Sequence, residues 1–111
     1  MSDLKNQKCE ACRIDAPLLS EQELQNLQNE IPEWNVIVDD NVPRLTREFS
    51  FKNFLDALNF VNKVGALAES ENHHPEMVVA WGKATISWWT HKIRGLHLND
   101  VIMAAKTDEL F

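Results

Sequence analysis

Residues 76–91 read EMVVAWGKATISWWTH, and this stretch decides the fold. Every second residue is apolar on both sides of the Gly82-Lys83 pair, which is typical of two antiparallel strands that share one buried face. Glycine in the first position of a two-residue loop favours a type II′ turn. The sequence therefore predicts a hairpin with strands over residues 77–81 and 84–90.

The position of this turn predicts which residues face each other. Paired positions sum to 165, so Trp81 lies opposite Ala84 and His74 lies opposite His91. Pro75 favours an extended His74, which supports carrying the pairing that far. The face expected to pack on helices carries Pro75, Met77, Val79, Trp81, Ala84, Ile86, Trp88 and Thr90. The opposite face carries His74, Glu76, Val78, Ala80, Thr85, Ser87, Trp89 and His91.

The remaining sequence supplies a second hairpin and three helices. Strands are predicted over residues 34–38 and 45–51, around a turn at residues 39–43. Ser20 and Glu23 have the spacing of a capping box, which predicts a helix from about 21 to 29. Asn53 is a suitable N-cap for the longest amphipathic helix, and a last helix spans 98 to about 110. These elements predict an α+β domain over residues 18–111, ordered α-β-β-α-β-β-α, with a four-stranded antiparallel sheet and helices packed on one face.

Composition restricts the class of protein. The chain has 111 residues, 44% hydrophobic and 25% charged, which is ordinary for one globular domain. A net charge of -6 argues against a nucleic-acid partner. No apolar run approaches the roughly 20 residues of a membrane span, and the polar first residues do not form a signal peptide, so a cytoplasmic location is expected.

Residues 1–17 are expected to be a flexible N-terminal tail that carries both cysteines, Cys9 and Cys12. A thioredoxin-like motif would follow a strand, and none is predicted upstream. We favour an inert reduced pair, with an intersubunit metal or redox bridge as the alternative.

All four histidines fall between positions 73 and 97. An imidazole titrates near pH 6.5, so clustered histidines are suited to general acid–base catalysis. Zinc binding is an alternative, although a zinc site usually needs three or four protein ligands. Purely structural histidines are the third reading of the spacing.

The spacing of seven residues resembles the signature of the pterin-4a-carbinolamine dehydratase family, also called 4a-hydroxytetrahydrobiopterin dehydratase. The signature positions are Glu69, His73, His74, Pro75, Trp81, His91 and Asp100. The resemblance extends over roughly residues 18–111, and the run from Trp88 to His91 looks like bacterial members, which accompany phenylalanine hydroxylase. The family has the same order of elements.

The resemblance implies a reaction: 4a-hydroxytetrahydropterin loses water to give quinonoid dihydropterin. This step recycles the pterin of aromatic amino-acid hydroxylases and needs no metal or organic cofactor. His73, His74 and His91 are the implied catalytic residues. We expect His74 and His91 to face the C4a hydroxyl and N5 of the pterin, while His73 orients the ring or donates the proton.

The resemblance also implies residues that contact the substrate or support the histidines. The substrate-binding candidates are Asn72, Pro75, Trp89, Thr90 and Trp34. The supporting candidates are Glu69 and Asp100.

Several of these side chains have plainer interpretations. Trp34 is equally suited to the core, and Trp89 to a subunit contact instead of a shelf for the pterin. Glu69 is also a plausible helix end, and Asp100 a first-turn acid favoured by the helix dipole. His97 is expected at the surface or as a helix cap, whereas Trp81 and Trp88 are expected in the core.

Partners follow from the same resemblance. A homodimer or homotetramer is implied, together with a pterin substrate and a functional link to phenylalanine hydroxylase. The alternative function is a protein-binding or transcriptional coactivator module of the same fold. A zinc-dependent hydrolase is a third hypothesis.

Overall fold

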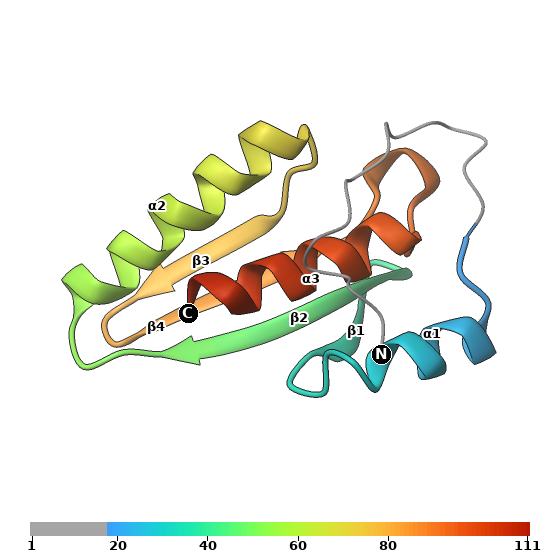
Figure 1. Cartoon of the computed structure of the whole chain (residues 1–111), viewed down its shortest axis with the longest axis horizontal. Helices are drawn as coiled ribbons and strands as arrows, with labels where there is room; N and C mark the ends of the chain where they lie inside the picture. Colours follow the sequence, from blue (N-terminus) through green and yellow to red (C-terminus); the bar gives the residue numbers. More distant parts are fainter. Residues whose placement is uncertain (1–17) are drawn as a thin grey trace.

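The second strands of the two hairpins form the centre of one antiparallel sheet. The computed structural model describes residues 18–111, and its strands are arranged in the order β1-β2-β4-β3 (Figure 1). Their bounds are β1 Asn35–Asp39, β2 Val42–Ser50, β3 Glu76–Ala80 and β4 Lys83–Trp88. Both predicted hairpins are therefore confirmed. The predicted N-terminal tail and its two cysteines lie outside the described residues.

The helices lie where local sequence signals place them. They are α1 Glu21–Gln28, α2 Phe54–Glu71, the 3-10 turn η2 His91–Ile93 and α3 Leu98–Leu110. Ser20 and Glu23 form the predicted capping box of α1, and the Asn53 side chain caps α2. Within residues 18–111, no helix is long and apolar enough to cross a membrane.

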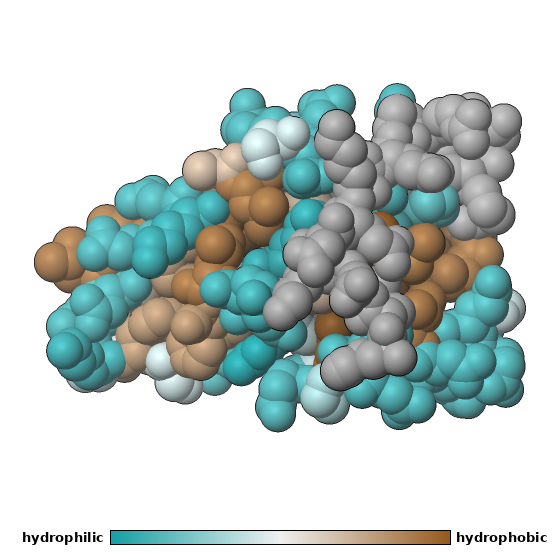
Figure 2. All heavy atoms as spheres, in the orientation of Figure 1, coloured by the Kyte–Doolittle hydropathy of each residue, from teal (hydrophilic) through white to brown (hydrophobic). Residues whose placement is uncertain are grey.

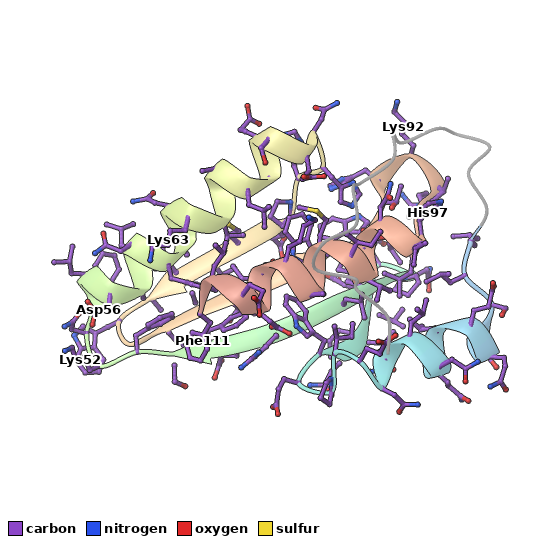
Figure 3. All side chains as sticks on the ribbon, in the orientation of Figure 1. Lys52, Asp56, Lys63, Lys92, His97 and Phe111 are labelled. Carbon is purple, nitrogen blue, oxygen red and sulfur yellow. The ribbon has the colours of Figure 1, made fainter. Side chains whose placement is uncertain are left out.

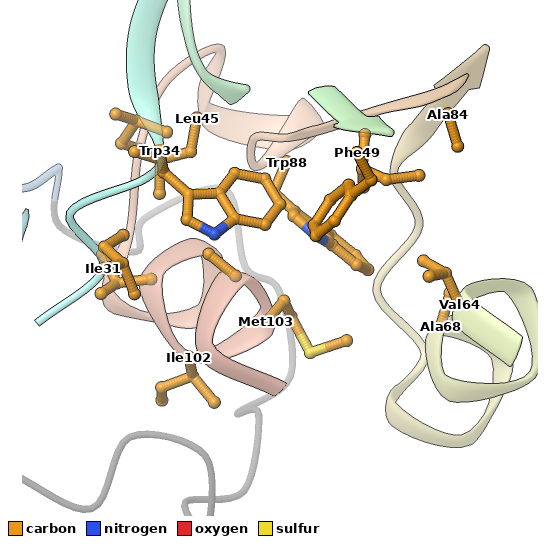
Figure 4. Close-up of a cluster of buried hydrophobic side chains, with 14 of the residues drawn as sticks. Ile31, Trp34, Leu45, Phe49, Val64, Ala68, Ala84, Trp88, Ile102 and Met103 are labelled. Atoms are coloured by element: carbon orange, nitrogen blue, oxygen red, sulfur yellow. The ribbon is translucent and has the colours of Figure 1, made fainter. Parts of the chain in front are cut away.

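The core lies between one face of the sheet and helices α2 and α3, while α1 lies beside β1 (Figure 1). Trp34 and Trp88 lie close to Met103 of α3 in the close-up of the core (Figure 4). Leu45, Phe49, Ala84, Ile86 and Trp88 line the sheet side. Burial of this apolar surface is the main stabilising contribution. The predicted α+β architecture, with helices on one face, is confirmed.

The register of the second hairpin differs from the prediction by two residues. Ala80 pairs with Lys83 and Met77 pairs with Ile86, so the two loop residues are Trp81 and Gly82. Gly82 has a φ of 75° in the second loop position, where a type II turn requires a positive value. Because side chains alternate with a period of two, this shift leaves the predicted faces unchanged.

The shift moves Trp81 out of the sheet and into the turn. Its side chain is 74% exposed, so the prediction that it belongs to the core is wrong, whereas Trp88 is fully buried as expected. A contact from outside the hairpin helps to fix the turn: the Phe51 N–H donates to the Gly82 carbonyl at 2.8 Å. The strand sequences alone do not contain that interaction.

Substitution by alanine is expected to have opposite effects at two of the three described glycines, Gly82 and Gly65. A Cβ on Gly82 would require an unfavourable positive φ and would lie 3.3 Å from the Phe51 carbonyl oxygen. We expect Gly82→Ala to lower the free energy of unfolding by about 1–2 kcal/mol. Gly65 lies inside α2 with room for a Cβ, 3.7 Å from the Met77 methyl. Gly65→Ala should raise the same quantity by up to about 1 kcal/mol.

Urea denaturation of both variants measures these effects. A Gly82→Ala protein as stable as wild type would contradict the turn geometry.

Candidate active site

Three of the four histidines meet where β3 begins and β4 ends. Helix α2 ends at Glu71, and the left-handed φ of 52° at its C-cap residue Asn72 changes the chain direction. His73 and His74 follow directly. His91 begins η2, just beyond β4. Lys92 of η2 and His97 at the start of α3 mark this end of the molecule in Figure 3, far from Phe111 at the other end of α3.

His73 points into the protein interior. Its side chain is only 3% exposed, and its Nε2–H donates to Oδ1 of Asp100 at 2.7 Å. The imidazole ring stacks on Trp88 with 5.7 Å between centroids and an interplanar angle of 5°. His73 is therefore held from its edge and from its face.

Asp100 connects three segments of the chain. Its carboxylate is fully buried, and Oδ2 accepts from the Thr90 hydroxyl at 2.8 Å and from the His97 N–H at 2.9 Å. With the bond from His73, the carboxylate accepts three hydrogen bonds in all. Three donors offset the desolvation of a buried carboxylate. Asp100 is thus more than a first-turn acid, because it also holds the ring of His73. A supporting role of Asp100 in a reaction stays a prediction.

His74 and His91 lie nearer the surface and contact each other. His74 is 53% exposed, and its Nε2 hydrogen-bonds to Oε2 of Glu69 in the last turn of α2. His91 donates from Nε2 to the main-chain carbonyl of His74 at 3.2 Å. Because His91 lies in η2 and the register is shifted, the predicted cross-strand pair of His74 and His91 is wrong. The two residues are nevertheless neighbours, through a side-chain to main-chain bond.

These contacts determine which ring nitrogens can react. A carbonyl oxygen and an ionised carboxylate only accept hydrogen bonds, so Nε2 carries the proton in His91 and in His74. In the described part of the chain, Nδ1 of each has no hydrogen-bond partner. The site therefore presents two imidazole nitrogens that can exchange protons with a small molecule.

Most of the predicted substrate contacts surround these histidines. Asn72 and Pro75 flank the histidine pair. Trp89 stacks on His91 with 4.4 Å between ring centroids. The Thr90 hydroxyl is occupied by Asp100, and its main-chain N–H and carbonyl are paired with Gly95. Contact of these residues with a substrate stays a prediction.

Trp34 lies apart from the histidines, at the C-terminal end of α3. It is 1% exposed, and its indole Nε1–H donates to Oδ1 of Asp108 at 2.9 Å. Arg47 donates to the same oxygen at 2.7 Å. Core packing of Trp34 is thus observed, whereas its contact with a substrate stays a prediction.

His97 and Arg44 complete the neighbourhood. The His97 side chain accepts at Nδ1 from the Asn99 N–H at 3.0 Å, so His97 caps α3, one of its two expected roles. Arg44, which sequence reasoning missed, lies over the Trp89 ring at 3.9 Å. A correct strand register would have found it, because Leu45 pairs with Trp88 and so brings Arg44 opposite Trp89. Within residues 18–111, no three His, Cys, Asp or Glu residues are grouped to hold a metal ion.

Asp100 and Asp56 are matched positions for a test of the buried carboxylate. Each is the third residue of its helix and the acid of the first turn. Asp100→Asn would turn an amide N–H₂ toward hydrogen-bond donors, so we expect a loss of about 1–3 kcal/mol in the free energy of unfolding. Asp56→Asn removes a helix-dipole contribution of about 0.3–1 kcal/mol. Chemical denaturation measures the free energy of unfolding of both variants. Equal losses would mean that Asp100 contributes no more to stability than an ordinary first-turn acid.

Asp108 predicts a pH dependence of stability. Burial raises the pKa of Asp108 above its ordinary value of 3.8, although hydrogen bonds from Trp34 and Arg47 act in the opposite direction. The folded protein holds this proton more tightly than the unfolded chain, so the associated stability is lost as the pH rises from about 3.8 through the raised pKa. Urea titrations from acidic to neutral pH should show this fall in wild type relative to Asp108→Asn. Parallel curves for the two proteins would contradict it.

Comparison with known proteins identifies the family. A family model described as pterin 4 alpha carbinolamine dehydratase matches residues 17–110. A protein from Marinobacter nauticus is 56% identical over 111 residues, which is 100% of both chains. One from Syntrophotalea carbinolica is 54% identical over 110 residues, or 99% of this chain and 98% of that protein. Both bear the name "Putative pterin-4-alpha-carbinolamine dehydratase".

Two solved structures have a fold similar to that of this chain. The crystal structure of a transcriptional coactivator/pterin dehydratase from Brucella melitensis matches with a TM-score of 0.77 and 29% identity, covering 85% of this chain and 98% of that chain. A pterin dehydratase-like protein, identified as a RuBisCO assembly factor in the alpha-carboxysome, has a TM-score of 0.59 and 20% identity, over 70% of this chain and 88% of that one. The second likeness shows the fold alone. Sequence and structure together establish that the chain belongs to the pterin 4 alpha carbinolamine dehydratase family.

Proposed function

We propose that this protein dehydrates 4a-hydroxytetrahydropterin to quinonoid dihydropterin and water, and so recycles the pterin of aromatic amino-acid hydroxylases. Family membership and the names of the full-length relatives support this class of reaction. The observation that carries the proposal is the contact of His91 with His74, in which both rings are anchored at Nε2 and present Nδ1.

The reaction needs one proton acceptor and one proton donor. N5 of the pterin loses its proton, the C4a–N5 bond becomes double, and the C4a hydroxyl leaves as water after it accepts a proton. Imidazole side chains can perform both transfers near neutral pH, and such catalysis typically accelerates a reaction about 10²–10⁴-fold. The atoms balance without any further reactant.

The burial of each histidine suggests its role. His74 and His91 are exposed, so we assign them to the region of the C4a hydroxyl and N5. His73 is enclosed by Asp100 and Trp88, so we assign it to orienting the site. Glu69 holds His74 in place from the last turn of α2.

The remaining substrate contacts are proposed from the resemblance. Asn72, Pro75 and Trp89 adjoin the exposed histidines, and we place the pterin against them. The hydroxyl of Thr90 is engaged by Asp100, so we propose that Thr90 acts by shaping the site. We propose that Trp34 contributes to substrate binding only indirectly, through its packing in the core.

A dehydration assay tests the proposed function. A phenylalanine hydroxylase generates the 4a-carbinolamine, and absorbance follows the formation of quinonoid dihydropterin with and without this protein. We expect wild type to accelerate the reaction and His74→Ala and His91→Ala each to lose about 10²-fold or more of that acceleration, because each removes a proton carrier.

His97→Ser is the matched control. It also replaces a histidine, but serine can cap α3 in the same way, so its activity should match that of wild type. No acceleration by folded wild-type protein would refute the enzymatic function.

We further propose that the protein acts as a homodimer or homotetramer in the cytoplasm, functionally linked to phenylalanine hydroxylase. Strands β1 and β3 form the two edges of the sheet, and an unpaired edge is a common site of association. Val78 on the edge strand β3 is 54% exposed. A second copy of the chain that covered this apolar side chain would be stabilised by its burial.

A protein-binding module is the second candidate function. Hydrophobic atoms reach the surface at the N-terminal end of α2 (Figure 2), where Phe54 and Leu55 are exposed. An apolar patch of this kind favours contact with another protein. The Brucella melitensis relative is named a transcriptional coactivator as well as a pterin dehydratase. An inactive wild type that associates with a partner would favour this function.

A further inference from the structure

Arg44 lies on the face of the sheet that the helices leave uncovered. Its neighbour Leu45 points into the core and pairs with Trp88, so Arg44 and Trp89 face each other on the opposite side. The Arg44 side chain is nevertheless only 15% exposed. A cation so largely covered on an open face requires specific neighbours.

Those neighbours form a row of stacked planar groups that leads to His91. The Arg44 guanidinium carbon lies 3.9 Å from the centre of the Trp89 ring. Trp89 in turn stacks on His91, with 4.4 Å between ring centroids and an interplanar angle of 29°. We call these three side chains the Arg44 stack. A planar guanidinium is well suited to such an arrangement, by both charge and shape.

The same guanidinium also contacts the segment that carries His74. Its Nη1 lies 3.6 Å from the Glu76 carboxylate and 3.5 Å from that of Asp39. Glu76 follows His74 by two residues. Arg44 therefore connects the segments that bear the two exposed histidines, and these are the residues joined by the bond from His91 to the His74 carbonyl.

Hydrogen bonding does not explain the position of Arg44. Its Nε is buried without a hydrogen-bond partner, and it is the sole such side-chain atom among residues 18–111. Leaving a buried donor unpaired is unfavourable, so the stack and the two carboxylates must outweigh that cost. Arg44 thus stacks on Trp89, which stacks on His91, although its own Nε is left without a hydrogen bond. This arrangement suggests a role of Arg44 at the site.

We propose that Arg44 is a positioning residue for His91 and His74, acting through Trp89 and Glu76. The proposal rests on the proposed function, because it assigns Arg44 to the geometry of the same acid–base pair. Proton transfer depends steeply on the placement of the ring nitrogen. Without Arg44 to hold Trp89, the face of the His91 ring is less restrained, and the bond from Nε2 to the His74 carbonyl alone fixes the direction of Nδ1 less closely.

Three variants separate stacking from charge. Arg44→Gln removes both the cation and the full guanidinium plane, and Arg44→Lys keeps the cation alone. Lys83→Gln is the matched control, since it removes a cation from the same sheet face, where Lys83 pairs with Glu48 at 3.7 Å. Circular dichroism and thermal melting first establish that each variant is folded.

Steady-state kinetics give the first readout. Both Arg44 variants should lower kcat about ten- to a hundredfold while changing KM less, as a misplaced catalytic group would. Lys83→Gln should retain the wild-type kcat. Full activity in Arg44→Lys would overturn the stacking role, because an ammonium group has no plane to stack.

The ring-proton NMR signals of His91 give a second readout that needs no activity. The Trp89 ring current shifts these signals in wild type, and Arg44→Gln should move them while Lys83→Gln leaves them unchanged. Unmoved signals in Arg44→Gln would overturn the proposal, whatever the kinetics show. If wild type is inactive, the dehydratase function fails, and the NMR comparison still decides whether Arg44 positions His91.

Discussion

The buried carboxylate of Asp100 is the interaction on which the arrangement of the site depends. It accepts hydrogen bonds from His73, from Thr90 and from the N–H of His97. These donors come from the connection after α2, from the chain beyond β4 and from the start of α3. One buried carboxylate therefore connects three segments of the chain through hydrogen bonds, and each segment restricts the position of the others.

This anchor explains why two adjacent histidines have different environments. Proline favours an extended conformation of the residue before it, and adjacent side chains of an extended chain point to opposite sides. His73 consequently enters the interior and meets Asp100 and Trp88, whereas His74 faces outward beside Glu69. A buried histidine of fixed orientation therefore lies directly next to an exposed one within a single dipeptide.

The central strand β2 contributes to both faces of the sheet. Leu45 and Phe49 are buried beneath the helices, while Arg44 reaches Trp89 and Glu76 on the other side. The alternation of side chains along one strand thus links the core to the exposed histidines. On the histidine side of the molecule, Asp100 contacts His73 from the interior, and Arg44 contacts Trp89 on the sheet surface.

Much of this protein follows from the sequence by itself because the signals are local. Capping residues Ser20 and Asn53, the apolar periodicity of α2 and the turn residues before β2 predict the order of elements, and the spacing of the histidines predicts the family. The register of the second hairpin was decided by tertiary structure, since the bond from Phe51 to Gly82 lies outside the hairpin. Exposure of Trp81 follows from that shift. The burial of Asp100 and the stacking of Arg44 likewise depend on strands and helices meeting in space, which no spacing along the chain encodes.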